Sequence, residues 1–190
     1  MFTFKKKYFL IIKSIKDIDL KNIKKRNKFI IIYRMHQKYE DISALLIFRK
    51  KCKSKGIKFF VANNLKLAIK LGSDGIYLSA KNNSFRSLNL KKNNFHLIGS
   101  AHDVKEINLK KKQGCVDILL SRLFQVTYKP KMNYLGINKF NLCVLNIDKN
   151  IVPLGGINLS NLNNLKSIKS YGFALMSELK KKPAIISRFF

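Results

Sequence analysis

Short apolar runs alternate with longer mixed segments along the whole chain. The clearest run is Phe29–Tyr33 (FIIIY), which is rich in β-branched residues and apolar on both faces, as is typical of a strand buried on both sides. Seven further runs predict strands over Tyr8–Ile12, Ile57–Ala62, Gly75–Leu78, His96–Gly99, Val116–Leu120, Ile151–Leu154 and Phe173–Met176. Strands that alternate with helical segments indicate a parallel sheet.

Helical segments separate several of these strands. Glu40–Lys55 predicts an amphipathic helix, Leu65–Leu71 a short one and Val104–Lys112 a third, each with a glycine soon after it. Lys129–Asn150 gives no clear helix. Eight such units predict the α/β class: a compact, single (β/α)8 TIM barrel domain over residues 1–190, with some helices short or missing. A doubly wound open sheet is the alternative.

The charge is strongly basic, with 39 basic and 10 acidic residues and a formal net charge of +29. This balance suggests nucleic acid or an anionic membrane as a partner. However, Lys is spread along the chain among many Asn, Ile and Phe residues, which is the bias of an AT-rich genome, and no RNP-like pattern, zinc-finger spacing or zipper occurs. We therefore expect a solvated basic surface and no specific nucleic-acid partner, with weak nonspecific binding to polyanions at low salt.

The cysteines and the N-terminal run indicate the compartment. Cys52, Cys115 and Cys143 have no CxxC spacing, so we expect small buried side chains in a reducing compartment. The first apolar run, Tyr8–Ile12, is too short for a signal-peptide core or a membrane span. The sequence therefore predicts a cytoplasmic protein with no membrane partner.

Candidate functional residues follow the predicted strands, where parallel βα proteins place their sites. Gly155 and Gly156 separate a strand from a helix start, so their N–H groups can approach a phosphate, although a tight turn that requires positive φ is the alternative. With Ser177, after the next strand, they predict a phosphate site. Arg34 follows FIIIY and is equally consistent with a phosphate ligand or an exposed loop residue.

Three more strand ends carry polar residues. In Ser100-Ala101-His102-Asp103 the residues are adjacent, so they cannot form a catalytic triad, and Ser100 or Asp103 is expected to cap the next helix. Lys129 follows the sixth strand; a phosphate role is possible there, but the residues alone favour a surface loop. Asn63-Asn64 and Asn82 place amides where an enzyme that handles a metal and a phosphate would have carboxylates.

The order of these strand ends resembles the thiamine phosphate synthase/TenI family of TIM barrels. The resemblance runs from Tyr8 to about Leu179. Its carriers are Arg34, VANNLKLAIKLGSDGIYLS, IGSAH, GCVDILLSRLFQVTYK, VPLGGI and GFALMSEL. The synthase branch of the family joins an aminopyrimidine diphosphate to a thiazole phosphate with loss of pyrophosphate, and Mg²⁺ and cationic side chains stabilise the departing group.

The resemblance also implies roles for single residues. Asn64 and Asn82 stand at the two positions where the family has metal-binding Asp, so Mg²⁺ is implied as a cofactor only if the chain is an active synthase. An amide oxygen can ligate Mg²⁺ but brings no charge to it. Catalytic roles are implied for Arg34, Ser100 and Lys129. Binding of substrate or phosphate is implied for Asn63, Gly155, Gly156 and Ser177.

Other family positions differ in this chain. Ile32 replaces the Gln that reads the pyrimidine, and His36 replaces a Lys. Val126 and Tyr128 replace the two Thr of the diphosphate loop. In the TenI branch, a thiazole tautomerase, the catalytic His position corresponds to Arg122.

We therefore predict a thiamine phosphate synthase-like protein of thiamine biosynthesis that binds a thiazole phosphate or thiamine phosphate, with weak or lost synthase activity. The resemblance implies a homodimer. The alternatives are an active synthase that holds the diphosphate with little or no metal, a TenI-like non-synthase, and a basic binding or regulatory protein.

Overall fold

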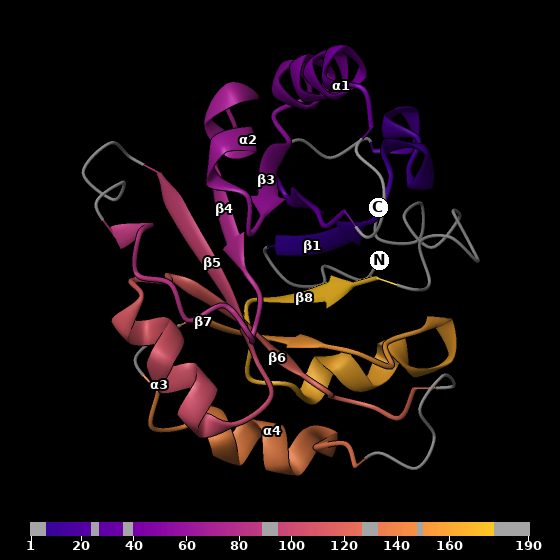
Figure 1. Cartoon of the computed structure of the whole chain (residues 1–190). Helices are drawn as coiled ribbons and strands as arrows, with labels where there is room; N and C mark the ends of the chain where they lie inside the picture. The colour runs from indigo at the N-terminus through magenta and orange to yellow at the C-terminus, as the bar shows by residue number, and fades with distance from the viewer. Residues whose placement is uncertain are drawn as a thin grey trace.

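A computed structural model describes residues 7–23, 27–35, 40–88, 95–126, 133–147 and 150–176 of the chain. In this part of the chain, eight parallel strands pair in sequence order and close into a barrel, with the last strand beside the first (Figure 1). The strands are β1 (Lys7–Ile12), β2 (Phe29–Tyr33), β3 (Lys58–Ala62), β4 (Gly75–Leu78), β5 (His96–Ala101), β6 (Asp117–Ser121), β7 (Asn150–Leu154) and β8 (Gly172–Leu175). The predicted α/β barrel is confirmed, and the open-sheet alternative is wrong.

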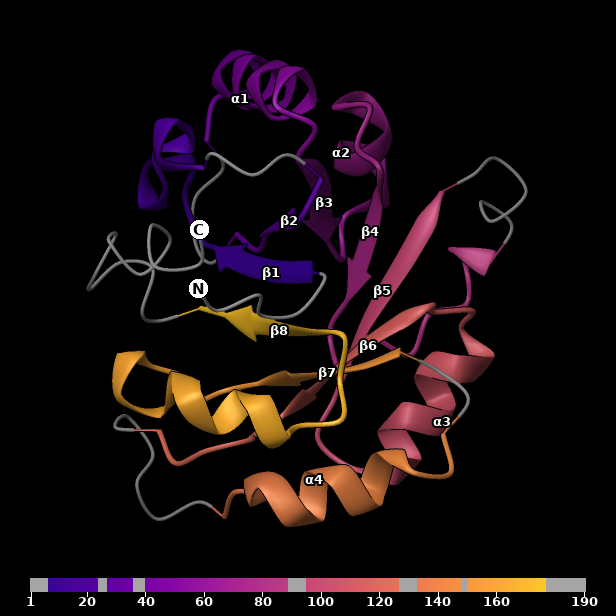
Figure 2. The same cartoon turned by 180° about the vertical axis from the view of Figure 1, so that it is seen from behind.

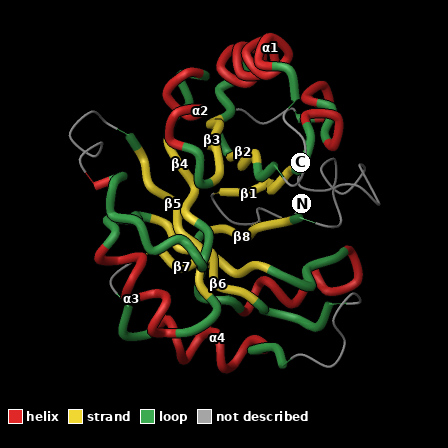
Figure 3. The backbone as a smooth tube through the Cα atoms, in the orientation of Figure 1, coloured by secondary structure: helices red, strands yellow, loops and turns green. Residues whose placement is uncertain are grey.

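Helices cover the outside of the barrel (Figure 3). Figure 2 shows α1 and α2 on one side of the molecule, and α3 and α4 on the opposite side. The α-helices are α1 (Ile42–Ser54), α2 (Leu65–Lys70), α3 (Val104–Lys112) and α4 (Gly136–Val144). Short 3-10 helices η1 (Ile15–Asp17) and η2 (Leu20–Asn22) follow β1, and η4 (Leu159–Ser167) follows β7. Between β4 and β5 the described residues contain no α-helix, which agrees with the expectation of missing helices.

The strands are apolar on both faces because the barrel buries both. Alternate side chains point into the lumen, where every strand contributes to one buried cluster. This inner cluster contains Phe9, Ile11, Ile30, Ile32, Phe60, Tyr77, Ile98, Leu119, Val152 and Ala174. The other set packs between the strands and the helices. Each fully buried large apolar side chain contributes roughly 1.5–3 kcal/mol.

Most element predictions are confirmed, with boundary shifts of at most two residues for the strands. The helix predicted over Glu40–Lys55 begins at Ile42 instead. The segment Lys129–Asn150, for which no helix is predicted, contains α4. Within the described ranges, no helix is long and apolar enough to cross a lipid bilayer.

Candidate functional site

The loops after β3 and β4 bring two of the predicted site residues together. The Asn82 Nδ2 group donates a hydrogen bond to Asn63 Oδ1 at 3.0 Å. Asn63 Oδ1 also accepts from the Ser79 backbone N–H at 2.9 Å, while Asn63 Nδ2 donates to Ser79 Oγ at 3.0 Å. Asn63 adopts φ of 56°, in the left-handed region that Asn tolerates better than most residues. The Asn63 side chain therefore ties the carboxyl end of β3 to the loop after β4.

The Asn64 side chain has a different role. Its side-chain oxygen accepts the Leu67 backbone N–H at 3.0 Å and so caps the N-terminus of α2. The Asn82 oxygen likewise accepts the Ser84 backbone N–H at 2.9 Å. Both amide oxygens that would face a metal are thus already engaged with backbone donors.

Gly155 and Gly156 make the turn from β7 into η4. Their φ values are 96° and 69°, so the tight turn with positive φ, the alternative to a phosphate site, is present, whereas the phosphate site stays a prediction. A Cβ on Gly155 would lie 2.8 Å from Arg122 Cγ, and one on Gly156 would lie 2.4 Å from the Phe124 carbonyl oxygen. The Phe124 N–H also donates to the Gly155 carbonyl at 3.0 Å. The two glycines therefore let the loop after β6 pack directly against the β7 turn.

The start of η4 is capped by Asn158. Its side-chain oxygen accepts the N–H groups of Ser160 at 3.0 Å and Asn161 at 3.3 Å. The Asn161 side chain returns the interaction by accepting the Asn158 N–H at 2.9 Å, and it donates to the Gly156 carbonyl at 2.8 Å. This reciprocal capping box fixes the conformation of the turn that follows Gly156.

Arg34 and Ser100 lie at the same end of the barrel. Arg34 directly follows β2, and its backbone N–H donates to the Ile12 carbonyl at 2.8 Å. Ser100 is buried within β5, whereas Asp103 caps α3 by accepting the Glu106 N–H at 2.8 Å. Of the two cap residues considered from the sequence, Asp103 is therefore the one that caps the helix.

Tyr77 is a lumen residue that sequence reasoning missed. It belongs to the inner cluster and is buried, on the strand next to the one that carries Ser100. Burial raises the pKa of its hydroxyl, and the interactions with Ser100 and with the charge of Arg34 lower it in part. The period-two alternation of GIYL was the signal available, because it places Tyr77 on the face opposite Ile76 and Leu78. The Tyr77 phenol therefore interacts inside the barrel with the Ser100 hydroxyl and with the charge of Arg34.

Two predicted site residues, Lys129 and Ser177, lie outside the described residues. The predicted catalytic role of the first and phosphate-binding role of the second therefore stay predictions.

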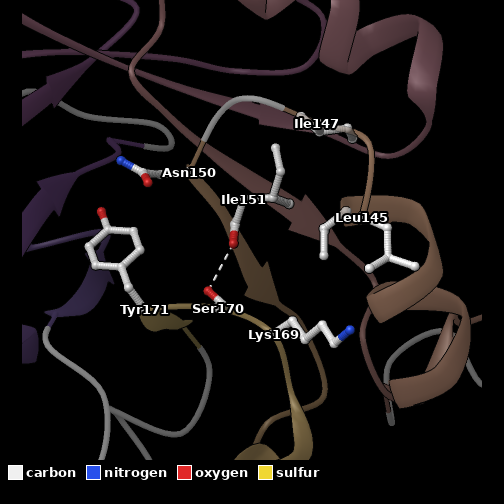
Figure 4. A pocket seen from close by; sticks show the side chains of 8 residues that line it. Leu145, Ile147, Asn150, Ile151, Lys169, Ser170 and Tyr171 are labelled. Atoms are coloured by element: carbon white, nitrogen blue, oxygen red, sulfur yellow. Dashed lines mark hydrogen bonds between the residues drawn. The ribbon is translucent and has the colours of Figure 1, made fainter.

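A pocket of about 310 Å³ opens at the other end of the barrel (Figure 4). Asn150, Ser170 and Tyr171 line it near the amino ends of β7 and β8, and Val144, Leu145 and Ile147 form its wall toward α4. It contains none of the predicted site residues. Because parallel barrels carry their chemistry at the carboxyl ends of the strands, the candidate site is the mouth formed by the loops after β2 to β7.

Comparison with known proteins identifies the family. Residues 19–179 match the model of the family described as thiamine monophosphate synthase (TMP-TENI). The chain belongs to this family. Comparison with curated protein sequences finds no match.

Solved structures share the fold with this family member at low sequence identity. Thiamine phosphate pyrophosphorylase from Pyrococcus furiosus has a TM-score of 0.71 and 15% identity, over 99% of this chain and 98% of that chain. 3-Keto-L-gulonate-6-phosphate decarboxylase from Vibrio cholerae has a TM-score of 0.63 and 12% identity, over 98% and 99%. 3-Hexulose-6-phosphate synthase from Salmonella typhimurium has a TM-score of 0.64 and 10% identity, over 96% and 97%.

This member of the thiamine monophosphate synthase family differs from the family pattern at positions in the barrel lumen and in the loop after β6. Ile32 is fully buried in the lumen and Val126 is buried in the loop after β6, so both positions hold packed apolar side chains without hydrogen-bonding groups. Arg122 is half-buried and lies against Gly155. His36 and Tyr128 lie outside the described residues.

The residues present do not fit a magnesium site held by carboxylates. Mg²⁺ favours charged oxygen ligands in octahedral geometry, whereas Asn64 and Asn82 offer neutral oxygens that already accept backbone N–H groups. Among the described residues, no group of three or more His, Cys, Asp or Glu side chains is placed to hold a metal ion.

Proposed function

We propose that this protein acts in thiamine biosynthesis as a thiamine phosphate synthase-like barrel in the cytoplasm, and that it binds a thiazole phosphate or thiamine phosphate at the Gly155–Gly156 turn. Membership of the thiamine monophosphate synthase family supports the ligand class. We propose a homodimer on the same ground. The Gly155–Gly156 turn is the observation that carries the proposal, because it lies at the carboxyl end of β7 and consists of two residues without side chains, so its backbone can approach an anion closely.

We further propose that synthase activity is weak or lost. Departure of pyrophosphate needs positive charge around the diphosphate. Arg34 supplies one such charge at the mouth and Lys129 a second by family resemblance, but Asn64 and Asn82 supply amides committed to backbone donors. Ile32 and Val126 are buried apolar side chains at positions where the resemblance implies polar contacts to the pyrimidine and the diphosphate.

The first test is ligand binding by calorimetry with thiazole phosphate and with thiamine phosphate. Wild-type protein should bind one of them saturably. Gly156→Ala should weaken this binding at least about tenfold, because a Cβ 2.4 Å from the Phe124 carbonyl must displace the loop. Gly136→Ala is the matched control, since its φ of 68° imposes the same backbone strain with no atom within 4 Å. Absence of binding by the wild type, or equal loss in both variants, would refute the proposal.

The second test measures turnover by thiochrome fluorescence with the aminopyrimidine diphosphate and the thiazole phosphate. We expect little or no product, and no difference between Mg²⁺ and EDTA. Substantial product only in Mg²⁺ would mean that the two amides do hold a metal. Substantial product that survives EDTA would instead favour the metal-independent synthase.

A further inference from the structure

We propose that Lys110 and Gln113, at the end of α3, are positioning residues that hold the loop after β4 (residues 79–84, the β4 loop) in the shape that presents Asn82 to the candidate site. The geometry carries the positioning role by itself. What the positioned loop binds rests on the proposed function.

Lys110 is the most unusual side chain in the described structure because it is a lysine with 0% exposure. Its Nζ group donates to the Asn82 carbonyl oxygen at 2.6 Å and to Gln113 Oε1 at 2.8 Å. The Asn82 contact joins residues 28 positions apart in the chain. Burial lowers the pKa of Lys110, and the nearby Cys115 and Glu106 oppose that shift. Burying an ammonium group is costly, so its hydrogen bonds must repay part of that cost.

Gln113, the C-cap residue of the same helix, completes the contact. It is 1% exposed, and its Nε2 group donates to the Asn82 carbonyl at 2.9 Å and to the Ser84 carbonyl at 2.9 Å. The described part of the connection between β4 and β5, residues 79–88 and 95, contains no α-helix that could supply donors to the Asn82 and Ser84 carbonyls. Lys110 and Gln113 supply the missing donors from a neighbouring helix.

Gly99 on β5 makes this arrangement possible. A Cβ at Gly99 would lie 2.9 Å from Lys110 Cγ, 3.0 Å from Lys110 Cβ and 3.0 Å from Cys115 Sγ. The glycine therefore lets the lysine stem lie against the strand while its ammonium reaches the β4 loop.

The loop is consequently held from two directions. Lys110 and Gln113 bind the Asn82 backbone from α3, and the Asn82 side chain binds Asn63 at the end of β3. Asn63 in turn binds Ser79, where the loop begins. The buried ammonium of Lys110 therefore holds the β4 loop in place. No metal ion is needed for this, and Asn64 and Asn82 do not supply the carboxylates that a magnesium site favours.

The test uses full-length Lys110→Met and Gln113→Leu, with Lys112→Met as the matched control because Lys112 is exposed on the same helix. Hydrogen exchange is measured at the amides of Ser79, Asn82 and Ser84, which are hydrogen-bonded within the loop or to Asn63. We expect exchange about tenfold faster in Lys110→Met and Gln113→Leu, with the strand amides unchanged. The affinities of the same variants for the aminopyrimidine diphosphate and for the thiazole phosphate are measured by calorimetry.

In Lys110→Met and Gln113→Leu, the affinity for the aminopyrimidine diphosphate should fall about tenfold, and the affinity for the thiazole phosphate should stay the same.

Unchanged exchange in the β4 loop of both variants would overturn the positioning role. Equal weakening of the two ligands would also overturn it, because a general loss of structure affects both. If the wild type does not bind the aminopyrimidine diphosphate, the exchange comparison alone decides whether Lys110 and Gln113 hold the loop. If it binds neither thiazole phosphate nor thiamine phosphate, the proposed function fails independently of that comparison. Should Lys110→Met not fold, Gln113→Leu gives the same two readouts.

Discussion

At the scale of single residues, the choice between Asn and Asp decides what the mouth of the barrel can do. An amide has a donor and an acceptor, and Asn82 uses both, donating to Asn63 Oδ1 and accepting from Ser84. A carboxylate at position 82 would have no proton to donate, so it could not form the hydrogen bond to Asn63 Oδ1. The closed amide network and a metal site are therefore alternative uses of the same positions.

The double variant Asn64→Asp/Asn82→Asp tests this choice. Without divalent cations its free energy of unfolding should fall by about 1 kcal/mol, because a carboxylate in place of the Asn82 amide cannot donate to Asn63. Millimolar Mg²⁺ should restore it, since a ligand that binds only the folded state stabilises that state. Urea denaturation with and without Mg²⁺ measures both effects. Asn83→Asp, in the same loop but exposed, is the control and should show no response to Mg²⁺.

Asp117 and Tyr171 form a hydrogen bond at the opposite end of the barrel, with the phenol donating to the carboxylate at 2.5 Å. Burial raises the pKa of Asp117 above its ordinary value, and the Tyr171 bond lowers it in part. A raised pKa means that the folded state keeps its proton longer, so the free energy of unfolding falls as pH rises through the interval between the unfolded and folded values.

Tyr171→Phe should raise the pKa of Asp117 further and enlarge that loss. We expect a destabilisation of about 1–3 kcal/mol at neutral pH and a smaller one at mildly acidic pH. Urea denaturation across this pH range provides the measurement. A variant that is equally destabilised at all pH values would show that the phenol stabilises the fold without acting on the carboxylate.

Thiol reactivity tests the burial of the cysteines. Burial raises the pKa of Cys52 to about 12, and Cys115 is buried as well, whereas Cys143 is half-buried. The thiolate is the reactive form, so one thiol should react with Ellman's reagent in the folded protein and all three in denaturant. Cys143→Ser should remove the rapid reaction. Rapid labelling of Cys52 in the folded protein would contradict the structure.

At the scale of elements, the strands could be predicted because their apolar runs are complete in the local sequence. FIIIY, for example, carries its whole signal in five residues. α4 was missed because GINKFNLCV mixes asparagines and β-branched residues, and only Phe140 is buried among its side chains. Whether such a segment forms a helix is decided by its tertiary packing.

The candidate site, too, could be predicted only in part from the local sequence. The glycine pair and the amides at the strand ends could be found from their positions in the chain. The burial of Lys110 could not be predicted, because it depends on Gly99 of β5 and on the Asn82 carbonyl, which lies 28 positions away in the chain. Within the run KKK, the local sequence predicts a lysine exposed to solvent. The role of Lys110 is instead decided by contacts between segments that are distant in the chain.

Arg49 couples three elements. Its Nη2 atom lies 3.2 Å from Asp74 Oδ1, its Nε donates to the Gly72 carbonyl at 3.0 Å, and Asp74 Oδ2 accepts the Phe59 N–H at 2.7 Å. Arg49→Met should therefore cost about 1–3 kcal/mol of unfolding free energy, because it leaves a partly buried carboxylate without its cation. Urea denaturation measures this cost. Lys50→Met, exposed on the same helix, should cost less than about 0.5 kcal/mol, and equal losses would mean that the pair does not link α1 to the barrel.

At the scale of the whole molecule, a net charge of +29 on 190 residues makes the surface attract polyanions regardless of their sequence. Two DNA duplexes of unrelated sequence should therefore bind with equal affinity at low salt. Both should lose about a thousandfold or more between roughly 50 and 200 mM salt, because binding of this kind is driven by release of counterions from several phosphates.

A small phosphorylated ligand behaves differently because it displaces few counterions. Its affinity at the Gly155–Gly156 turn should fall by less than about tenfold over the same salt range, so fluorescence titrations of DNA and calorimetry of thiamine phosphate separate the two modes of binding. A preference for one duplex that persists at high salt would instead indicate a nucleic-acid site, because base contacts specify sequence while phosphate contacts only position the protein. The charge of the whole molecule would then serve a function that the barrel mouth does not provide.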